Sequence, residues 1–211
     1  MPVGIYSFYR LLQPRFREKR ARLFLETFAP NATTRILDIG GNVYDWRELP
    51  IESRITVLNV APTDSSTAYS DRFDYVQGDG RNLPFADQSF DIVYANSVIE
   101  HLRTFDDQRR FGTEALRVGR RVFIQTPNRW FPVEPHFVTL FVHYLPKSVQ
   151  RLVLPRLSFR GLFRSGDDVN LKALFDELRL LSARELGAIF PGCRVHRERM
   201  LGLTKSLIAI R

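Results

Sequence analysis

Residues 35–41, Arg-Ile-Leu-Asp-Ile-Gly-Gly, constrain this chain more than any other stretch. The aliphatic run is typical of a buried central strand in a parallel sheet, and it ends in an acid followed by two glycines. Glycine has no Cβ, so the main chain at that point can approach a ligand closely. The stretch therefore predicts a strand whose carboxyl end delivers the backbone to a binding site.

Length and composition fit one globular domain. A chain of 211 residues, 44% hydrophobic and 26% charged, can bury a substantial core. No run reaches the roughly 18–20 uncharged apolar residues that cross a bilayer, and the N-terminal residues lack the pattern of a signal peptide. Cys193 is the only cysteine, so we expect no internal disulfide and a reducing, cytoplasmic location.

The net charge of +8 is concentrated in two segments. Residues 10–22 hold six basic residues and one acid, and residues 135–166 hold five basic residues and no acid. Such patches attract nucleic acid, anionic lipid or anionic small molecules. The alternative is a solvated basic face with no partner, and the sequence leaves both interpretations open.

The hydrophobic pattern alternates between strands and helices. Strands are expected at residues 35–39, 55–60, 73–77, 90–95, 121–125, 193–199 and 206–211. Helices are expected at residues 15–28, 106–118 and 182–190, the last begun by a capping box, with short helices at 46–49, 137–144 and 148–154. This order predicts an α/β fold: a seven-stranded, mostly parallel sheet with helices on both faces and an antiparallel C-terminal hairpin.

Three segments carry a resemblance to a known family. They read Ile36-Leu-Asp-Ile-Gly-Gly41, Gly78-Asp-Gly-Arg-Asn-Leu-Pro-Phe85 and Ser89-Phe-Asp-Ile-Val-Tyr-Ala-Asn-Ser-Val-Ile-Glu-His-Leu102. At this separation they resemble class I S-adenosylmethionine-dependent methyltransferases of the type 11 methyltransferase-domain subgroup. The resemblance implies a Rossmann-like fold, S-adenosyl-L-methionine as cofactor, and one methyltransferase domain over residues 1–211. Within it we expect an N-terminal helical segment (1–30) and a substrate-side insert or lid (127–180).

The resemblance implies that the glycine turn holds the methionine end of the cofactor. Asp38 would favour its ammonium group directly or through water, and Gly40 and Gly41 would let the main chain approach it. The family's usual pattern is Gly-x-Gly-x-Gly, whereas Asn42 follows the glycine pair here. Because asparagine tolerates positive φ better than most residues, Asn42 can replace the second glycine in part.

Further positions complete the implied cofactor site. Asn59 stands where the family usually has an acid that binds both ribose hydroxyls; an amide can donate as well as accept. Asp79, with Gly80 beside it, would accept a hydrogen bond from the adenine amino group. Asn96 would line the cofactor near the point of methyl transfer. The departures at Asn42 and Asn59 leave open a weakened cofactor site.

Three residues are the predicted catalytic groups: His101, Glu100 and His136. An oxygen acceptor loses a proton when it is methylated, so a general base is expected. His101, preceded by Glu100, follows the fourth strand on the active-site side. His136 lies with Asn128 and Glu134 in a proline-rich loop that resembles a substrate loop. The structural alternatives are that Glu100-His101 braces the next segment and that the loop is merely pinned to the domain.

No metal is expected. Some quinone-pathway relatives hold a divalent ion with a Glu-x-x-Glu-His cluster, and Ser97 stands here in place of the first carboxylate. The segment 137–164 mixes aromatic and aliphatic residues with basic ones. It suits a lid over an apolar acceptor or a peripheral contact with an anionic membrane, and it equally suits ordinary packing onto the sheet.

The predicted function is methyl transfer to a small-molecule or lipid-like acceptor, with oxygen as the expected methylated atom. An RNA methyltransferase is an alternative favoured by the charge. It is disfavoured because residues 96–99 read Asn-Ser-Val-Ile rather than an Asn-Pro-Pro-Tyr-type motif. A non-catalytic binding protein with the methyltransferase fold is the other alternative. The sequence leaves the oligomeric state undetermined.

Overall fold

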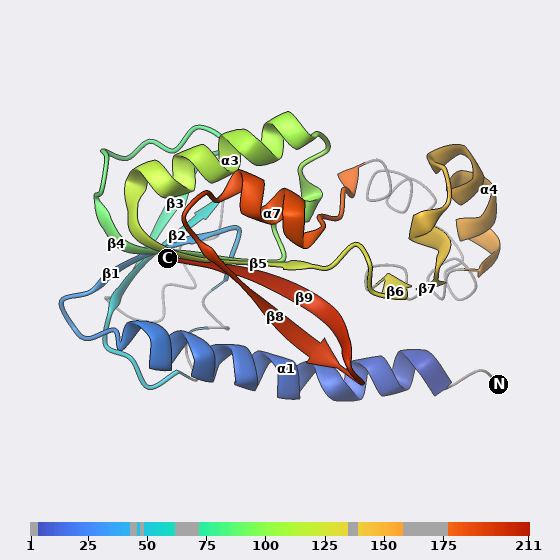
Figure 1. Ribbon diagram of the computed structural model, residues 1–211. Coiled ribbons are helices and arrows are strands. Elements are labelled where there is room, and N and C mark those ends of the chain that lie inside the picture. Colours follow the sequence, from blue (N-terminus) through green and yellow to red (C-terminus); the bar gives the residue numbers. More distant parts are fainter. Residues whose placement is uncertain (1–3, 43–45, 47–48, 62–71, 135–138, 158–176) are drawn as a thin grey trace.

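The computed structural model describes residues 4–42, 46, 49–61, 72–134, 139–157 and 177–211. In this part of the chain, one seven-stranded sheet has the order β3-β2-β1-β4-β5-β9-β8 (Figure 1). Its strands are β1 (Arg35–Ile39), β2 (Arg54–Asn59), β3 (Phe73–Gln77), β4 (Phe90–Asn96), β5 (Gly119–Pro127), β8 (Arg194–Met200) and β9 (Leu203–Ile210). Strands β1 to β5 run parallel, and β9 is antiparallel to both β5 and β8. The predicted mostly parallel sheet and its C-terminal hairpin are confirmed.

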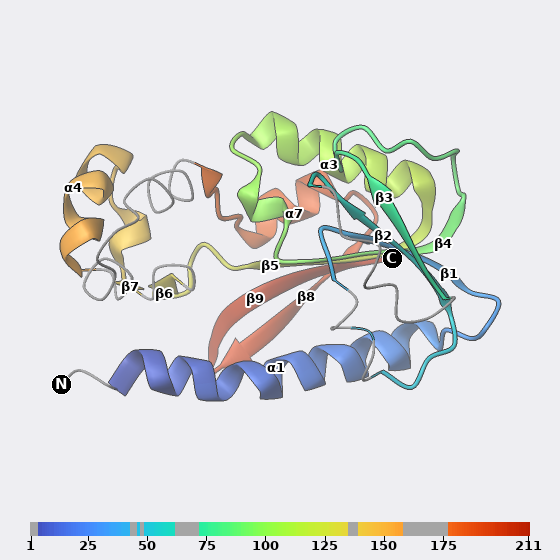
Figure 2. The same ribbon diagram turned by 180° about the vertical axis from the view of Figure 1, so that it is seen from behind.

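Helices cover both faces of the sheet, as predicted. Helix α1 (Gly4–Phe28) runs along one face, while α3 (Phe105–Val118) and α7 (Ala183–Ile189) lie on the other (Figures 1 and 2). Neighbouring residues of β1 therefore point into different cores. Ile36 packs with Phe24 of α1, and Leu37 packs with Phe111 of α3. A strand covered on both faces reads as a continuous apolar run rather than an alternating one.

Local sequence signals fix the N-termini of the two helices on the second face, α3 and α7. The Ser182 side chain accepts from the backbone N–H of Glu185, whose carboxylate accepts from the Ser182 N–H. The Thr104 hydroxyl oxygen likewise accepts from the Asp107 N–H at 3.0 Å. Each cap satisfies a helix N–H that would otherwise lack a partner. The capping box that the sequence predicted at Ser182 is confirmed.

The segment after β5 differs from the prediction in part. Helix α4 (Lys147–Leu157) includes the expected helix at 148–154, but no α-helix covers the described residues of the range 137–144. Instead β6 (Val133–Glu134) pairs with β7 (Thr139–Leu140), and a 3₁₀ turn, η3 (Val142–Tyr144), follows. Phe141 adopts φ of 61° and its N–H donates to the Pro132 carbonyl, so the chain turns there and cannot continue as a helix.

Residues 47 and 48 of the expected short helix at 46–49 lie outside the described residues, so this prediction is not tested. No helix among the described residues has the length and apolar character needed to cross a membrane.

Candidate functional site

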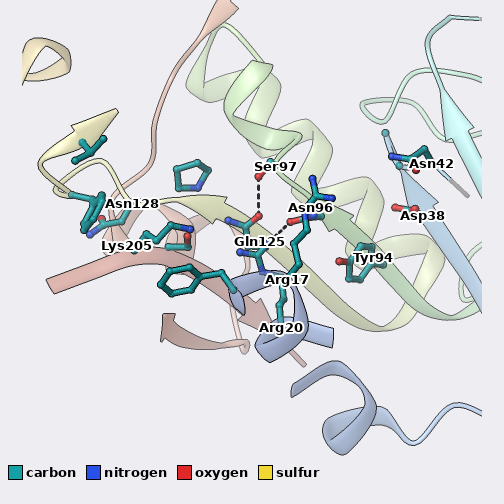
Figure 3. Close-up of a pocket in the computed structure, with 17 residues that line it drawn as sticks. Arg17, Arg20, Asp38, Asn42, Tyr94, Asn96, Ser97, Gln125, Asn128 and Lys205 are labelled. Carbon is teal, nitrogen blue, oxygen red and sulfur yellow. Dashed lines mark hydrogen bonds between the residues drawn. The ribbon is translucent and has the colours of Figure 1, made fainter. Parts of the chain in front are cut away.

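A cavity of about 330 Å³ opens at the carboxyl ends of β1, β4 and β5. Figure 3 shows Asp38 on one side and Lys205 on the other, with Arg17 and Arg20 of α1 between them. Ligands of open α/β sheets bind at this end of the strands, in the crevice outside the sheet. We call residues 38–42 the glycine-turn side of the cavity, and Arg17, Arg20 and Lys205 its basic side.

The glycine turn is shaped around the Asp38 carboxylate. Asp38 is 1% exposed, and its Oδ2 accepts from the indole N–H of Trp46 at 2.6 Å. A Cβ at position 41 would lie 1.7 Å from that oxygen, so only glycine fits there with the carboxylate in place. Gly40 has φ of 72°, a left-handed conformation that favours glycine. Asp38, Gly40 and Gly41 all line the cavity, as does Asn42.

Asn59 contacts this turn from the end of β2. Its Nδ2 donates to the Gly41 carbonyl at 2.9 Å, which ties the turn to the neighbouring strand. Asn59 is half-buried and is not among the residues that line the cavity. A carboxylate at this position would face that carbonyl without a proton to donate. The amide therefore suits a bracing contact to the turn.

Asp79 lies outside the described lining of the cavity and is engaged by Arg81. The Arg81 Nε is 3.0 Å from both carboxylate oxygens, and Nη2 donates to Oδ2 at 2.6 Å. Hydrogen bonding to Arg81 lowers the pKa of Asp79, so the carboxylate is an acceptor at neutral pH. Gly80 serves packing, since a Cβ there would lie 2.9 Å from Phe111 and 3.0 Å from Ile39.

A buried ion pair joins α1 to β8 beside the cavity. Arg20 donates from Nε and Nη2 to the two carboxylate oxygens of Glu198, at 3.1 and 2.8 Å. Both side chains are 8% exposed. The third nitrogen, Nη1, donates to the Asn96 Oδ1 at 2.5 Å, as drawn in Figure 3. The ion pair thus orients Asn96, which lines the cavity at the end of β4.

Lys205 reaches the cavity because β9 is antiparallel to β5. Ser206 pairs with Pro127, so the start of β9 lies beside the carboxyl end of β5. The Asn128 N–H donates to the Lys205 carbonyl at 3.0 Å, and its Nδ2 donates to the Thr204 carbonyl at 2.8 Å. These bonds fix the loop after β5 to the first residues of β9.

The ammonium group of Lys205 is held in an unusual setting. Its Nζ lies 4.2 Å from the centre of the Phe16 ring, a cation–π geometry. The residue is 8% exposed. Burial, together with the nearby charge of Arg20, lowers the pKa of Lys205 from 10.5 to about 8, against the opposing effect of Glu198.

The residues predicted to be catalytic are not grouped at the cavity. Glu100 is fully buried; its Oε2 accepts from the Thr126 hydroxyl at 3.0 Å, and its carbonyl accepts from the Arg179 N–H. His101 ends the 3₁₀ turn η2 (Ile99–His101) and is half-buried. Neither is among the described lining residues. His136 lies outside the described residues. The catalytic roles of Glu100, His101 and His136 therefore stay predictions.

The residues at the site that the sequence did not indicate include Arg17, Arg20 and Lys205, which line the cavity. They also include Trp46, which donates to Asp38. Trp46 stands in a segment with no clear periodicity. Arg20 belongs to a run of basic residues that reads as a solvated helix face. The one available signal for Lys205 is its place in a terminal segment that continues into the apolar residues 207–210, where a charge needs a partner or a function.

The sequence matches a family model, and the fold is similar to those of solved methyltransferases. Residues 37–121 match the family model of the methyltransferase domain. A methyltransferase from Aquifex aeolicus, described as S-adenosylmethionine-dependent, superposes with a TM-score of 0.55 at 13% identity over 98% of each chain. Phosphoethanolamine N-methyltransferase 2 from Haemonchus contortus, in complex with S-adenosyl-L-methionine, gives 0.56 at 15% identity, over 85% of this chain and 38% of that one.

The same fold also occurs with another activity. The [4+2]-cyclase SpnF superposes with a TM-score of 0.53 at 16% identity over 84% of this chain. This chain spans 57% of the SpnF chain and 47% of another solved structure that it resembles. No curated protein matches the sequence. At these identities the solved structures establish the fold, and activity has to be argued from the site.

Proposed function

We propose that this chain is a class I S-adenosylmethionine-dependent methyltransferase, which transfers a methyl group from S-adenosyl-L-methionine to a small-molecule or lipid-like acceptor; the match of residues 37–121 to the methyltransferase-domain model supports this. The observation that carries the proposal is the glycine turn at the mouth of the cavity. Asp38 lies buried over Gly41, and a side chain at position 41 would collide with it. The cofactor would supply, when bound, an electrophilic methyl group on a sulfonium.

The residues of the glycine-turn side fit such a cofactor. A buried carboxylate and a backbone open to close approach suit the amino-acid end of the ligand, which carries an ammonium group. Asn59 would act by bracing the turn, through its 2.9 Å bond to Gly41, rather than through the ribose. Asn96, held by Arg20, would line the passage between the two sides of the cavity.

Methyl transfer is an in-line displacement in which the protein contributes mainly position and charge. The proposal therefore gives the acceptor the basic side of the cavity, beyond Asn96. Oxygen as the methylated atom, with His101 as base, is part of the proposal. If His101 is the base, His101→Gln lowers the turnover number, because glutamine cannot accept the proton. The affinity for S-adenosyl-L-methionine is expected to stay unchanged.

Calorimetry with S-adenosyl-L-methionine tests the proposal and the adenine assignment together. We expect binding to the wild-type chain, and Asp79→Ala to weaken it about 10- to 100-fold, because a hydrogen bond to a charged acceptor contributes roughly 1.5–3 kcal/mol. No binding at millimolar cofactor would overturn the enzyme proposal and favour a binding protein.

Arg81→Met is the matched control for this measurement. It removes the cation that now occupies Asp79 but keeps the carboxylate. If Asp79 binds adenine, Arg81→Met leaves the affinity unchanged or raises it. If Asp79 only anchors Arg81, the two variants weaken binding equally, and the adenine assignment is wrong.

A lipid-like acceptor is favoured by one further observation. Large apolar side chains are exposed between residues 130 and 152, among them Trp130 at 63% and Leu152 at 65%. Lys147 and Arg151, on the same helix α4 as Leu152, are exposed as well. Apolar and basic side chains on one short helical segment are typical of contact with an anionic membrane surface. We include such a peripheral contact in the proposal.

Co-sedimentation with vesicles containing anionic lipid checks this contact. Leu152→Asp is expected to reduce binding at least about tenfold, because burial of a leucine side chain contributes roughly 1.5–3 kcal/mol. Val60→Asp is the control, since Val60 is 73% exposed at the end of β2. Equal effects of the two substitutions would contradict a specific membrane face.

RNA is the second candidate acceptor, favoured by the net charge of +8. Retention on RNA at low salt alone would not support it, because any basic surface binds phosphates in a salt-dependent manner. Methyl transfer to RNA that persists at physiological salt would replace the small-molecule proposal.

A further inference from the structure

Two neutral amide side chains border the cavity on the face of the sheet that α1 covers. Side chains two residues apart on a strand point to the same face. Phe123 of β5 packs in the core beneath α1, so Gln125 points to that face near the carboxyl end of the strand. Asn96 holds the equivalent place on β4, because Ile92, four residues earlier, packs in the same core. Both amides line the cavity, and Gln125 is only 2% exposed.

The two amides lie side by side. Asn96 and Gln125 are partners in the parallel register of β4 and β5, and neighbouring strands of a sheet are about 4.8 Å apart. Figure 3 shows both residues between Asp38 and Lys205. A single small group of a ligand can therefore contact both side chains at once.

Each amide oxygen already has a hydrogen-bond partner. Arg20 Nη1 donates to the Asn96 Oδ1, and a guanidinium can only donate, which fixes the orientation of that amide. The Ser97 hydroxyl donates to the Gln125 Oε1 at 3.0 Å, as Figure 3 also draws. The Ser97 N–H donates to the Gln125 carbonyl at 3.1 Å. Ser97 has φ of 59°, an uncommon conformation for a residue other than glycine, so the turn after β4 is shaped around Gln125.

The amide nitrogens hold the remaining hydrogen-bonding capacity. The Nδ2 of Asn96 and the Nε2 of Gln125 donate to no protein group within the described part of the chain. Because a donor without a partner in a nearly buried site costs free energy, these groups favour a ligand that accepts. A carbonyl oxygen has two lone pairs and no proton, so it can accept from two N–H groups. A hydroxyl group would bring a proton that needs an acceptor of its own.

We propose that Asn96 and Gln125 form a subsite for a carbonyl oxygen of the methyl acceptor, which places the acceptor among ketones, esters and amides. The inference rests on the proposed function and narrows its substrate class. Phe131 and Val133, which follow β5, also line the cavity and suit the hydrocarbon part of such a molecule. The subsite leaves the glycine turn, with Asp38, to the cofactor.

The side-chain NH2 signals of Asn96 and Gln125 in nitrogen-15 NMR spectra test this subsite directly. They are assigned through their own backbone signals, so the test needs no variant. S-adenosyl-L-homocysteine is present throughout, which excludes methyl transfer. Acetophenone, a ketone, should move both NH2 proton signals downfield, because the amides then donate to its carbonyl oxygen. If acetophenone leaves the signals in place, the subsite is refuted.

Two further ligands on a similar carbon frame distinguish the carbonyl from other oxygen groups. The alcohol 1-phenylethanol is expected to leave the signals in place, since its hydroxyl proton finds no acceptor there. If it moves them as far as acetophenone does, the assignment to a carbonyl is wrong. Benzoate tests an anionic ligand. If benzoate moves the signals and acetophenone does not, the amides bind an anion and the proposal is overturned.

Calorimetry with acetophenone measures the contribution of Gln125. Gln125→Met keeps the length of the side chain and removes its donors, so we expect binding to weaken about 2- to 10-fold, as for the loss of one neutral hydrogen bond. Gln77→Met is the matched control, because Gln77 is exposed at the end of β3 and outside the described lining of the cavity. Equal effects of the two substitutions would contradict a specific role of Gln125.

The same calorimeter separates the subsite from the proposed function. Gln125→Met is expected to bind S-adenosyl-L-methionine as the wild type does, and weaker binding of the cofactor would assign the amide to the cofactor site instead. If the wild type binds the cofactor but acetophenone moves neither NH2 signal, the subsite fails while the methyltransferase proposal stands. If acetophenone moves both signals but the cofactor does not bind, the subsite stands and the methyltransferase proposal fails.

Discussion

Arg20→Met is expected to destabilise the protein by about 3–5 kcal/mol, because it leaves the Glu198 carboxylate buried without its partner. Both side chains are 8% exposed, so water cannot replace the two hydrogen bonds that Arg20 donates. In a chain of this size the loss corresponds to a fall in melting temperature of roughly 6–20 °C. Denaturant unfolding of the variant measures it directly.

The helix supplies its own control two residues away. Arg22 pairs with Glu18 at 3.2 Å, but these side chains are 65% and 70% exposed. Arg22→Met is therefore expected to cost no more than about 0.5 kcal/mol. The double variant Arg20→Met/Glu198→Leu should recover most of the stability, since the uncompensated charge is gone. If Arg20→Met costs less than about 1 kcal/mol, the pair is not the buried link between α1 and β8 described here.

The fold could be predicted from the sequence because its signals are local. β1 reads as a continuous apolar run, since Ile36 faces the α1 core and Leu37 faces the α3 core. Ser182 and Glu185 are three residues apart and cap α7 by themselves. The error at 137–144 has the same origin. The apolar spacing there is typical of a helix. The chain instead pairs β6 with β7, and the left-handed backbone conformation of Phe141 does not allow an α-helix to pass through it.

The basic side of the cavity could not be predicted, because its contacts are distant in sequence. Arg20 and Glu198 are 178 residues apart, and nothing in either segment marks the other. Lys205 reaches the cavity only through the position of β9 beside β5. The bond from Asn59, at the end of β2, to the Gly41 carbonyl could not be predicted either, because it depends on the conformation of the turn.

Gly41→Ala is expected to weaken S-adenosyl-L-methionine binding about 10- to 100-fold. Its Cβ would lie 1.7 Å from the Asp38 Oδ2, so the carboxylate or the turn must move. Forcing a methyl group into a packed site costs typically 1–3 kcal/mol, and here the displaced group is the proposed partner of the ligand's ammonium. The bond from Trp46 to the same oxygen would be disturbed as well. Calorimetry and denaturant unfolding together measure the two effects.

Gly187→Ala is the control for this substitution. Gly187 lies in α7, where a Cβ would meet nothing closer than Val195 at 3.9 Å. Alanine is the better helix former by up to about 1 kcal/mol, so we expect unchanged cofactor affinity and equal or higher stability. If Gly41→Ala binds the cofactor as tightly as the wild type does, the turn does not hold the methionine end. The proposed cofactor site would then have to move away from Asp38. A loss of affinity confined to Gly41→Ala would instead tie binding to the space that only glycine leaves beside that carboxylate.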